Sequence, residues 1–146
     1  LDYVIAGIHS AFKMPKDKMT ERMIRAMRSP HIDIISHPTG RLLKKRDEYQ
    51  IDFDEILKVA RETGTILEIN AYPSRLDLKD EHIKMAKKYK IKFAVSTDAH
   101  NTGEFAYMEY GVAQARRALI EKDDLLNTLS LGKFLDLVQK PKNKRW

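Results

Sequence analysis

The sequence predicts an α/β fold in which about four parallel strands alternate with flanking helices. Short runs rich in β-branched and apolar residues alternate with segments in which apolar residues recur every three or four positions. Strands that are separated by helices form a parallel sheet through right-handed crossovers. Four strands fit either a small doubly wound sheet or part of a β/α barrel, because a whole barrel usually takes more than about 200 residues.

The order of elements is β-α-β-α-β-α-β-α-α. Strands are expected at 2–8, 32–35, 65–69 and 92–96, and helices at 17–27, 52–63, 78–89, 111–120 and after Ser130. The first helix repeats methionine at Met19, Met23 and Met27, a spacing typical of core packing. Asp52 is expected to cap the second helix, with a glutamate three residues later, and Gly64 to end it.

Composition restricts the classes of protein to which the chain can belong. Of its 146 residues, 42% are hydrophobic and 33% are charged, which is typical of a globular domain. No apolar run approaches the roughly 18 residues of a membrane span, and no secretory signal is visible, so we expect a cytoplasmic protein without a membrane partner. The absence of cysteine excludes disulfides, zinc fingers and cysteine nucleophiles. Any metal must therefore be bound by histidine, aspartate or glutamate.

The two ends of the chain carry their own signals. The first residue, Leu1, lies inside a predicted strand and there is no initiator methionine, which suggests a segment of a longer protein. Residues 140–146 form a basic tail that is expected to be frayed, which leaves 1–139 as the folded part. The net charge is +6, yet most lysines lie on predicted helix faces, where solvated charge is the ordinary explanation.

Side chains that can bind metal follow three of the predicted strands. His9 ends the first strand, His37 ends the second, and Asp98 and His100 follow the fourth. The carboxyl ends of parallel strands meet at one edge of a sheet, where sites are usually built. Imidazole and carboxylate ligands together suit zinc, manganese or iron. The sequence therefore predicts a divalent-metal site at this edge.

Other polar residues are expected at the same edge. Glu68 and Asn70 close the third strand, and Arg41 and Arg75 lie in loops just past strand ends. Arginine binds phosphate oxygens with a planar fork, so two such arginines beside metals suggest a phosphoester substrate. For each arginine the alternative is a salt bridge, for example between Arg75 and Asp77.

Three further features are a basic run and two histidines away from the strand ends. The run Lys44–Arg46 either extends the basic surface or is solvated. His31 precedes its strand, and His82 lies in the first turn of a polar helix. Both histidines are expected on the surface.

Five segments together resemble the PHP (polymerase and histidinol phosphatase) superfamily, in particular the C-terminal PHP domain of bacterial and archaeal family X DNA polymerases. The segments are Gly7–Ser10, Ser36–Arg41, Glu68–Ala71, Arg75–Leu78 and Ser96–Asn101. The resemblance implies a distorted β/α barrel that holds up to three divalent metals, manganese or zinc. It also implies metal-dependent hydrolysis, in this branch 3′-5′ exonuclease activity and related processing of DNA 3′ ends.

Carried over by motif, His9 and His37 resemble ligands of one metal, Asp98 of a second and His100 of a third. Asp98 and His37 are also the predicted catalytic residues. The predicted residues for phosphate and substrate are Arg41, Arg75, Asn70 and Ser10. The family's opening His-x-His motif, its following histidines and its bridging glutamate have no counterpart here. The chain is therefore interpreted as the later part of a PHP domain, with an incomplete metal site.

Three interpretations of function remain open at this point. The first is a metal-dependent phosphoesterase that acts on DNA 3′ ends within a family X polymerase and is inactive as this isolated chain. The second is a small-molecule phosphatase of the histidinol phosphatase type. The third is a non-catalytic folding fragment, which would pair with the missing N-terminal part of the domain or self-associate.

Overall fold

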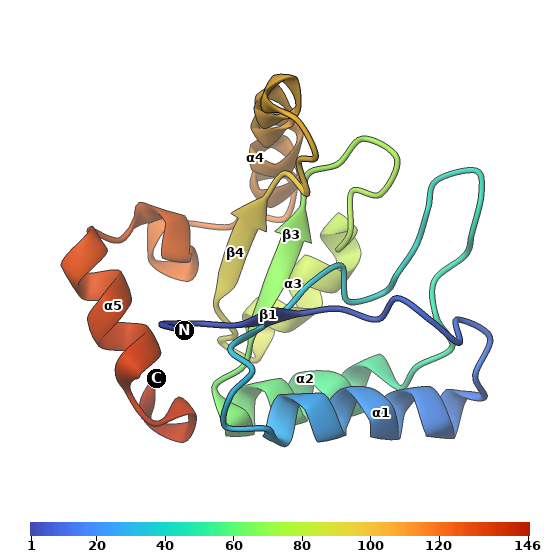
Figure 1. Ribbon diagram of the computed structural model, residues 1–146, viewed down its shortest axis with the longest axis horizontal. Helices are drawn as coiled ribbons and strands as arrows, with labels where there is room; N and C mark the ends of the chain where they lie inside the picture. The colour runs from blue at the N-terminus through green and yellow to red at the C-terminus, as the bar shows by residue number, and fades with distance from the viewer.

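The computed structural model describes residues 1–146 and contains one parallel sheet. The strands are β1 (Ile5–Ala6), β2 (Ile34–Ile35), β3 (Ile66–Asn70) and β4 (Phe93–Ser96), in the spatial order β1-β2-β3-β4 (Figure 1). Each strand lies beside the next one in the chain, as in the wall of a β/α barrel, whereas a doubly wound sheet reverses its order at a switch point. The predicted α/β class is confirmed, and the order is that of part of a barrel.

The first two strands are shorter than the sequence predicts. Strand β1 pairs only with β2, through Ile5 opposite Ile34 and Ala6 opposite Ile35. Because β1 has no neighbouring strand on its outer side, a longer strand would give few additional backbone groups a hydrogen-bond partner. Strands β3 and β4 pair over a longer register that ends with Asn70 opposite Ser96. The edge of the sheet that carries the predicted site is therefore defined mainly by β3 and β4.

The helices agree with the predicted order. They are α1 (Lys16–Arg28), α2 (Phe53–Thr63), α3 (Asp80–Lys88), α4 (Met108–Arg117) and α5 (Leu131–Gln139), with short 3-10 turns η1 (Thr102–Tyr107), η2 (Lys122–Asp124), η3 (Leu126–Thr128) and η4 (Lys142–Lys144). The Asp52 carboxylate accepts the Glu55 N–H at 3.1 Å, and Gly64 ends α2 in the left-handed region. Helix α4 begins at Met108 rather than Gly111, because the exposed Met108 gives no core-facing periodicity.

The sheet is covered on both faces. One face packs against helices α1 to α4 in a cluster of 18 buried residues, which includes Leu67, Ile69 and Phe93. The methionine stripe of α1 is buried as predicted. Helix α5 and the chain end cover the other face, where Ile34 and Ile66 meet partly buried side chains such as Phe134 and Trp146. Figure 1 shows α1 and α2 side by side along the bottom of the view, with α5 at the left. No helix has both the length and the apolar character needed to cross a membrane.

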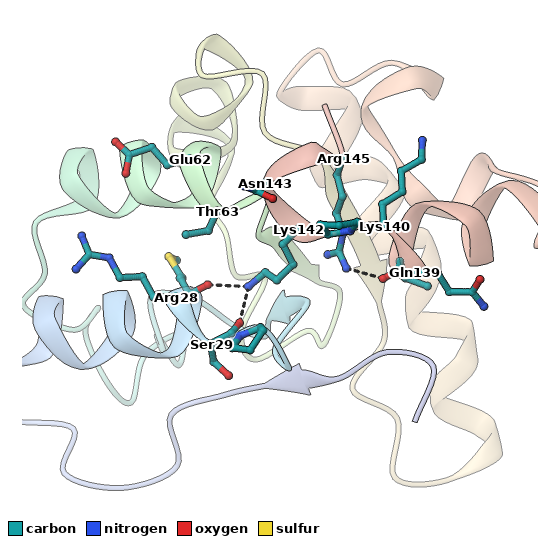
Figure 2. Close-up of a pocket in the computed structure, with 13 residues that line it drawn as sticks. Arg28, Ser29, Glu62, Thr63, Gln139, Lys140, Lys142, Asn143 and Arg145 are labelled. Atoms are coloured by element: carbon teal, nitrogen blue, oxygen red, sulfur yellow. Dashed lines mark hydrogen bonds between the residues drawn. The ribbon is translucent and has the colours of Figure 1, made fainter.

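The C-terminal tail is docked, and the expectation that it frays is wrong. The Lys142 ammonium donates to the backbone oxygens of Met27 and Ser29, at 2.6 Å and 3.1 Å (Figure 2). These carbonyls belong to the end of α1, where oxygens lack helical partners and favour a cation. Burial lowers the pKa of Lys142 to about 8. A row of lysines gives no sequence signal for such a partner, because the partner carbonyls lie more than a hundred residues away.

Arg145 fixes the same segment through a buried ion pair. Its side chain is almost fully buried, and Nη2 lies 2.5 Å from Asp33 Oδ1 and 2.8 Å from the Val138 carbonyl oxygen. A cavity of about 540 Å³ lies between this segment and the ends of α1 and α2 (Figure 2). Since Asp33 directly precedes β2, these contacts lie at the edge of the sheet opposite the predicted site.

We expect Arg145→Ala to lower the free energy of unfolding by about 3 kcal/mol, because it leaves the buried Asp33 carboxylate without its cation. Urea denaturation followed by circular dichroism measures the change. Adding Asp33→Asn should recover part of the loss, since the amide oxygen can still accept the Val4 N–H without a buried charge. An Arg145→Ala variant as stable as the parent chain would show that the tail does not dock.

Candidate functional site

Polar side chains from three neighbouring strands meet at the carboxyl edge of the sheet. Asn70 lies opposite Ser96, and Glu68 lies opposite Ala94. Residues that are paired in register or separated by two positions share one face of a sheet. Glu68, Asn70 and Ser96 therefore point to the face covered by α5, which in a closed barrel would be the interior.

The Glu68 carboxylate joins the ends of β2, β3 and β4. It is only 5% exposed. It accepts the backbone N–H of His37 at 2.5 Å, the side-chain amide of Asn70 at 3.2 Å and the hydroxyl of Ser96. Burial raises the pKa of Glu68, while these hydrogen bonds act in the opposite direction. The sequence predicts Glu68 at this edge but not its role in connecting the strands. The one available signal for that role is the presence of a glutamate inside an otherwise apolar strand.

The structure brings His9 and His37 together. Their ring centroids are 5.1 Å apart and the rings are perpendicular. His37 is buried, and its Nδ1 has no hydrogen-bond partner, which is unusual for a buried polar atom. Burial, then the charges of Arg75 and His9, lowers the pKa of His37 to about 4. The imidazole is therefore neutral at pH 7, the form in which histidine binds metal.

Asp98 is bound by two neighbours. Its Oδ2 atom lies 3.2 Å from Arg75 Nε and 3.2 Å from the Asn70 amide nitrogen. The salt bridge expected as the alternative for Arg75 is formed, but with Asp98 rather than Asp77. Arg75 Nη1 is buried and has no hydrogen-bond partner, which is unusual for a buried donor.

Arg41 and Asp77 connect the two loops that carry these residues. The Arg41 guanidinium donates to the backbone carbonyls of Arg75, at 2.9 Å, and of Leu76. Asp77 is fully buried and accepts the Thr39 hydroxyl at 2.8 Å and its N–H at 3.1 Å. Burial raises the pKa of Asp77 to about 6. In this arrangement Arg41 holds the Arg75 loop in place, and its role in phosphate binding stays a prediction.

Two of the predicted site residues have left-handed backbone conformations. His37 has φ of 30° and Asp98 has φ of 56°, where residues other than glycine pay about 1 kcal/mol or more. Such conformations concentrate at functional sites when surrounding contacts over-determine them. Here the Glu68 carboxylate holds the N–H of His37, and the amide of Asn70 holds the side chain of Asp98.

The remaining predicted residues lie further out. The side chain of His100 is 78% exposed, and its Nδ1 lies 2.8 Å from the Asp98 backbone oxygen. Ser10 is exposed and contacts the Arg22 guanidinium at 3.4 Å. His31 is exposed as predicted. His82 is half-buried rather than exposed, since its ring stacks on Phe53 with centroids 4.2 Å apart.

The donor set fits part of a metal centre. No group of three or more histidine, aspartate or glutamate side chains converges in a way that could hold an ion. His9 and His37 supply two nitrogens side by side, one of them buried and unpaired. A catalytic metal site usually has at least three protein ligands, so this pair would need further ligands to hold an ion.

Comparison with known proteins relates the chain to enzymes of phosphoester chemistry. It is 44% identical over 131 residues to the DNA polymerase/3′-5′ exonuclease PolX of Bacillus subtilis, covering 90% of this chain and 23% of that protein. It is 33% identical over 153 residues to a probable phosphatase of Thermoanaerobacter sp., covering 99% of this chain and 60% of the relative. A probable phosphatase of Caldicellulosiruptor saccharolyticus is 30% identical, with 55% of its length covered.

These relationships confirm the resemblance that the sequence motifs indicated. No protein-family model matches the chain. The chain spans about a quarter of the polymerase and about 60% of the phosphatases, so each relative has a substantial part without a counterpart here.

The low pKa of His37 should make stability fall at acidic pH. Between about pH 6.5 and pH 4 the unfolded imidazole takes up a proton that the folded one does not, so the unfolded state gains stability as the pH falls. Replacing His37 with glutamine should reduce the loss between pH 7 and pH 4.5 by about 2 kcal/mol. Urea denaturation of both proteins at the two pH values measures this difference. The raised pKa of Asp77 changes stability in the opposite direction to that of His37. Because both proteins contain Asp77, this contribution cancels in the comparison. Parallel pH profiles would contradict the shift.

Proposed function

We propose that this chain is part of a metal-dependent phosphoesterase that, in the intact protein, cleaves phosphodiesters at DNA 3′ ends. The observation that carries the proposal is the unpaired, buried Nδ1 of His37 beside His9, close enough to Arg75 for the arginine's charge to lower the pKa of His37. An exonuclease name among the relatives supports the DNA substrate.

His9 and His37 would hold one divalent cation, manganese or zinc, and Asp98 and His100 would contribute to neighbouring ones. Such a cation, when bound, supplies Lewis-acid activation of the phosphoester and of water. Arg75 would bind a non-bridging phosphate oxygen through Nη1, while its Nε stays on Asp98. A donor fixed in this way stabilises the charge that develops on phosphate oxygens in the transition state. Arg41, Asn70 and Glu68 would keep Arg75, Asp98 and His37 in position.

The remaining ligands would come from another polypeptide segment. We infer that the chain alone is inactive and gains its full site from the N-terminal part of a PHP domain or by self-association. The half-site in this chain and the uncovered length of each relative support this inference.

Metal content tests the half-site directly. After gel filtration in manganese, the chain should retain at most one weakly bound ion. His37→Ala should reduce even that, whereas His31→Ala, at the opposite edge of the sheet, should not. Elemental analysis of the eluted protein measures the ratio. Two or three tightly held ions per chain would contradict the half-site.

A small-molecule phosphatase is the second candidate, since two of the named relatives are probable phosphatases. The substrates separate the two candidates. The chain combined with the N-terminal part of the domain should shorten a 5′-labelled oligonucleotide from its 3′ end in manganese. Hydrolysis of p-nitrophenyl phosphate without cleavage of the oligonucleotide would instead establish the phosphatase.

In the same reconstituted protein, Asp98→Ala should lower kcat by about 100-fold or more, because it removes a ligand and the partner of Arg75. Arg75→Lys keeps the charge but loses the fork, so we expect a loss of about tenfold or more. His31→Ala serves as the matched control. Full manganese-dependent activity in Asp98→Ala would refute the assignment of this edge as the active site.

A further inference from the structure

A preformed stack of a cation and two aromatic rings lies beside the candidate site. The guanidinium carbon of Arg46 is 4.0 Å from the centre of the Phe12 ring. The rings of Phe12 and Tyr49 are parallel within 5°, with centroids 5.9 Å apart. Cation–π attraction of this kind holds the guanidinium over the ring. The run Lys44–Arg46, for which solvation was one interpretation, thus contains one arginine that is held in place.

The stack is tied to the backbone that carries the two histidines. Arg46 Nε donates to the Gly40 carbonyl at 2.8 Å, three residues past His37. The Tyr49 hydroxyl donates to the Ile8 carbonyl at 3.0 Å, next to His9. Gly40 has φ of 63°, and a Cβ there would overlap the Tyr49 ring, so only glycine allows this contact. The stack therefore keeps a fixed position relative to the metal half-site.

A hollow of about 560 Å³ adjoins the stack within the loop 41–50. Its lining includes the basic side chains Arg41, Lys44 and Arg46, and Lys45 is exposed beside it. Asp47 and Glu48 also line the hollow, and Glu48 is already paired with Lys79 at 3.3 Å, so the three basic side chains face one unpaired carboxylate. That leaves a surplus of positive charge around a space large enough for a nucleotide.

We propose that Arg46, seated on Phe12, is a stacking subsite for a nucleobase of a single-stranded nucleic acid, with Lys44 and Lys45 neutralising the adjoining phosphates. Bases of single strands stack on arginine guanidinium planes as well as on aromatic rings. Since Phe12 and Gly40 already hold the Arg46 guanidinium in place, binding costs little side-chain entropy. This inference rests on the proposed function, and it selects a polynucleotide over a small phosphomonoester.

Binding by the 146-residue chain tests the subsite without catalysis. The probes are a fluorescein-labelled twelve-nucleotide oligothymidine and an abasic strand with the same number of phosphates, both in EDTA, followed by fluorescence anisotropy. The chain should bind the oligothymidine about fivefold to 100-fold more tightly, as expected for one stacked base. Arg46→Lys keeps the charge but not the plane, so it should abolish most of this preference and leave binding of the abasic strand nearly unchanged.

Lys45→Ala is the matched control, because it removes a phosphate contact only. It should weaken binding of both strands by the same factor and reduce the salt dependence by about one charge. Phe12→Leu keeps apolar packing but removes the aromatic face, and it should also reduce the preference. Circular dichroism establishes that each variant is folded.

Equal binding of the two strands by the parent chain would overturn the proposal, as would a full preference in both Arg46→Lys and Phe12→Leu. A preference for bases in a protein that hydrolyses no phosphoester after reconstitution would retain the subsite and refute the proposed function. Hydrolysis without any preference for bases would retain the proposed function and refute the subsite.

Discussion

The buried carboxylate of Glu68 is the constraint on which the candidate site depends. A buried acceptor must be matched by donors, and here the donors come from the ends of three strands. The same hydrogen bonds hold His37 in a backbone conformation that it would otherwise avoid, and through Asn70 they reach Asp98. The direction of the His37 ring, and thus the position of its unpaired nitrogen, follows from a network rather than from a single contact. Such networks lose more than the sum of their bonds when one member is removed.

The two ends of the sheet are held by charged groups, and the middle is held by apolar packing. At the carboxyl edge, Arg41 and Asp77 join the loops that follow β2 and β3. At the opposite edge, Lys142 and Arg145 bind the end of α1 and the residue before β2. A buried ion pair adds little net stability compared with apolar side chains of similar size, but its geometry is specific. The structure therefore places the loops of the candidate site and the chain end at defined positions on opposite sides of one core.

The two outer edges of the sheet differ in whether their backbone groups are already paired. The outer side of β4 is occupied, since the Asn127 side chain both accepts the Val95 N–H, at 2.8 Å, and donates to the Val95 carbonyl, at 2.9 Å. The outer side of β1 has no such partner, and the Ile5 side chain is 46% exposed there. Since β1 leads directly to His9, a strand added at this edge would deliver its own terminal residues beside the histidine pair. This geometry is what the proposed completion of the site by a further segment requires.

The sequence by itself determined the class of fold, the order of elements and which predicted site residues lie at the carboxyl edge of the sheet. These features depend on local pattern: apolar periodicity fixes the type of each element, and the residue after a strand lies at its carboxyl edge wherever that strand is placed. The motifs around His9, His37 and Asp98 likewise indicated the relatives that comparison then found. The spatial strand order, which separates part of a barrel from a doubly wound sheet, required the structure.

Tertiary structure alone decided how the polar side chains are paired. Arg75 binds Asp98 rather than its sequence neighbour Asp77, because Asp77 is already buried against Thr39. The basic tail docks because Arg145 meets a carboxylate 112 residues earlier in the chain. Contacts between such distant residues leave no periodic signal, since each partner by itself resembles an ordinary surface charge. Local pattern thus specified which residues reach the site, and the packing of distant segments specified which of them remain free to act.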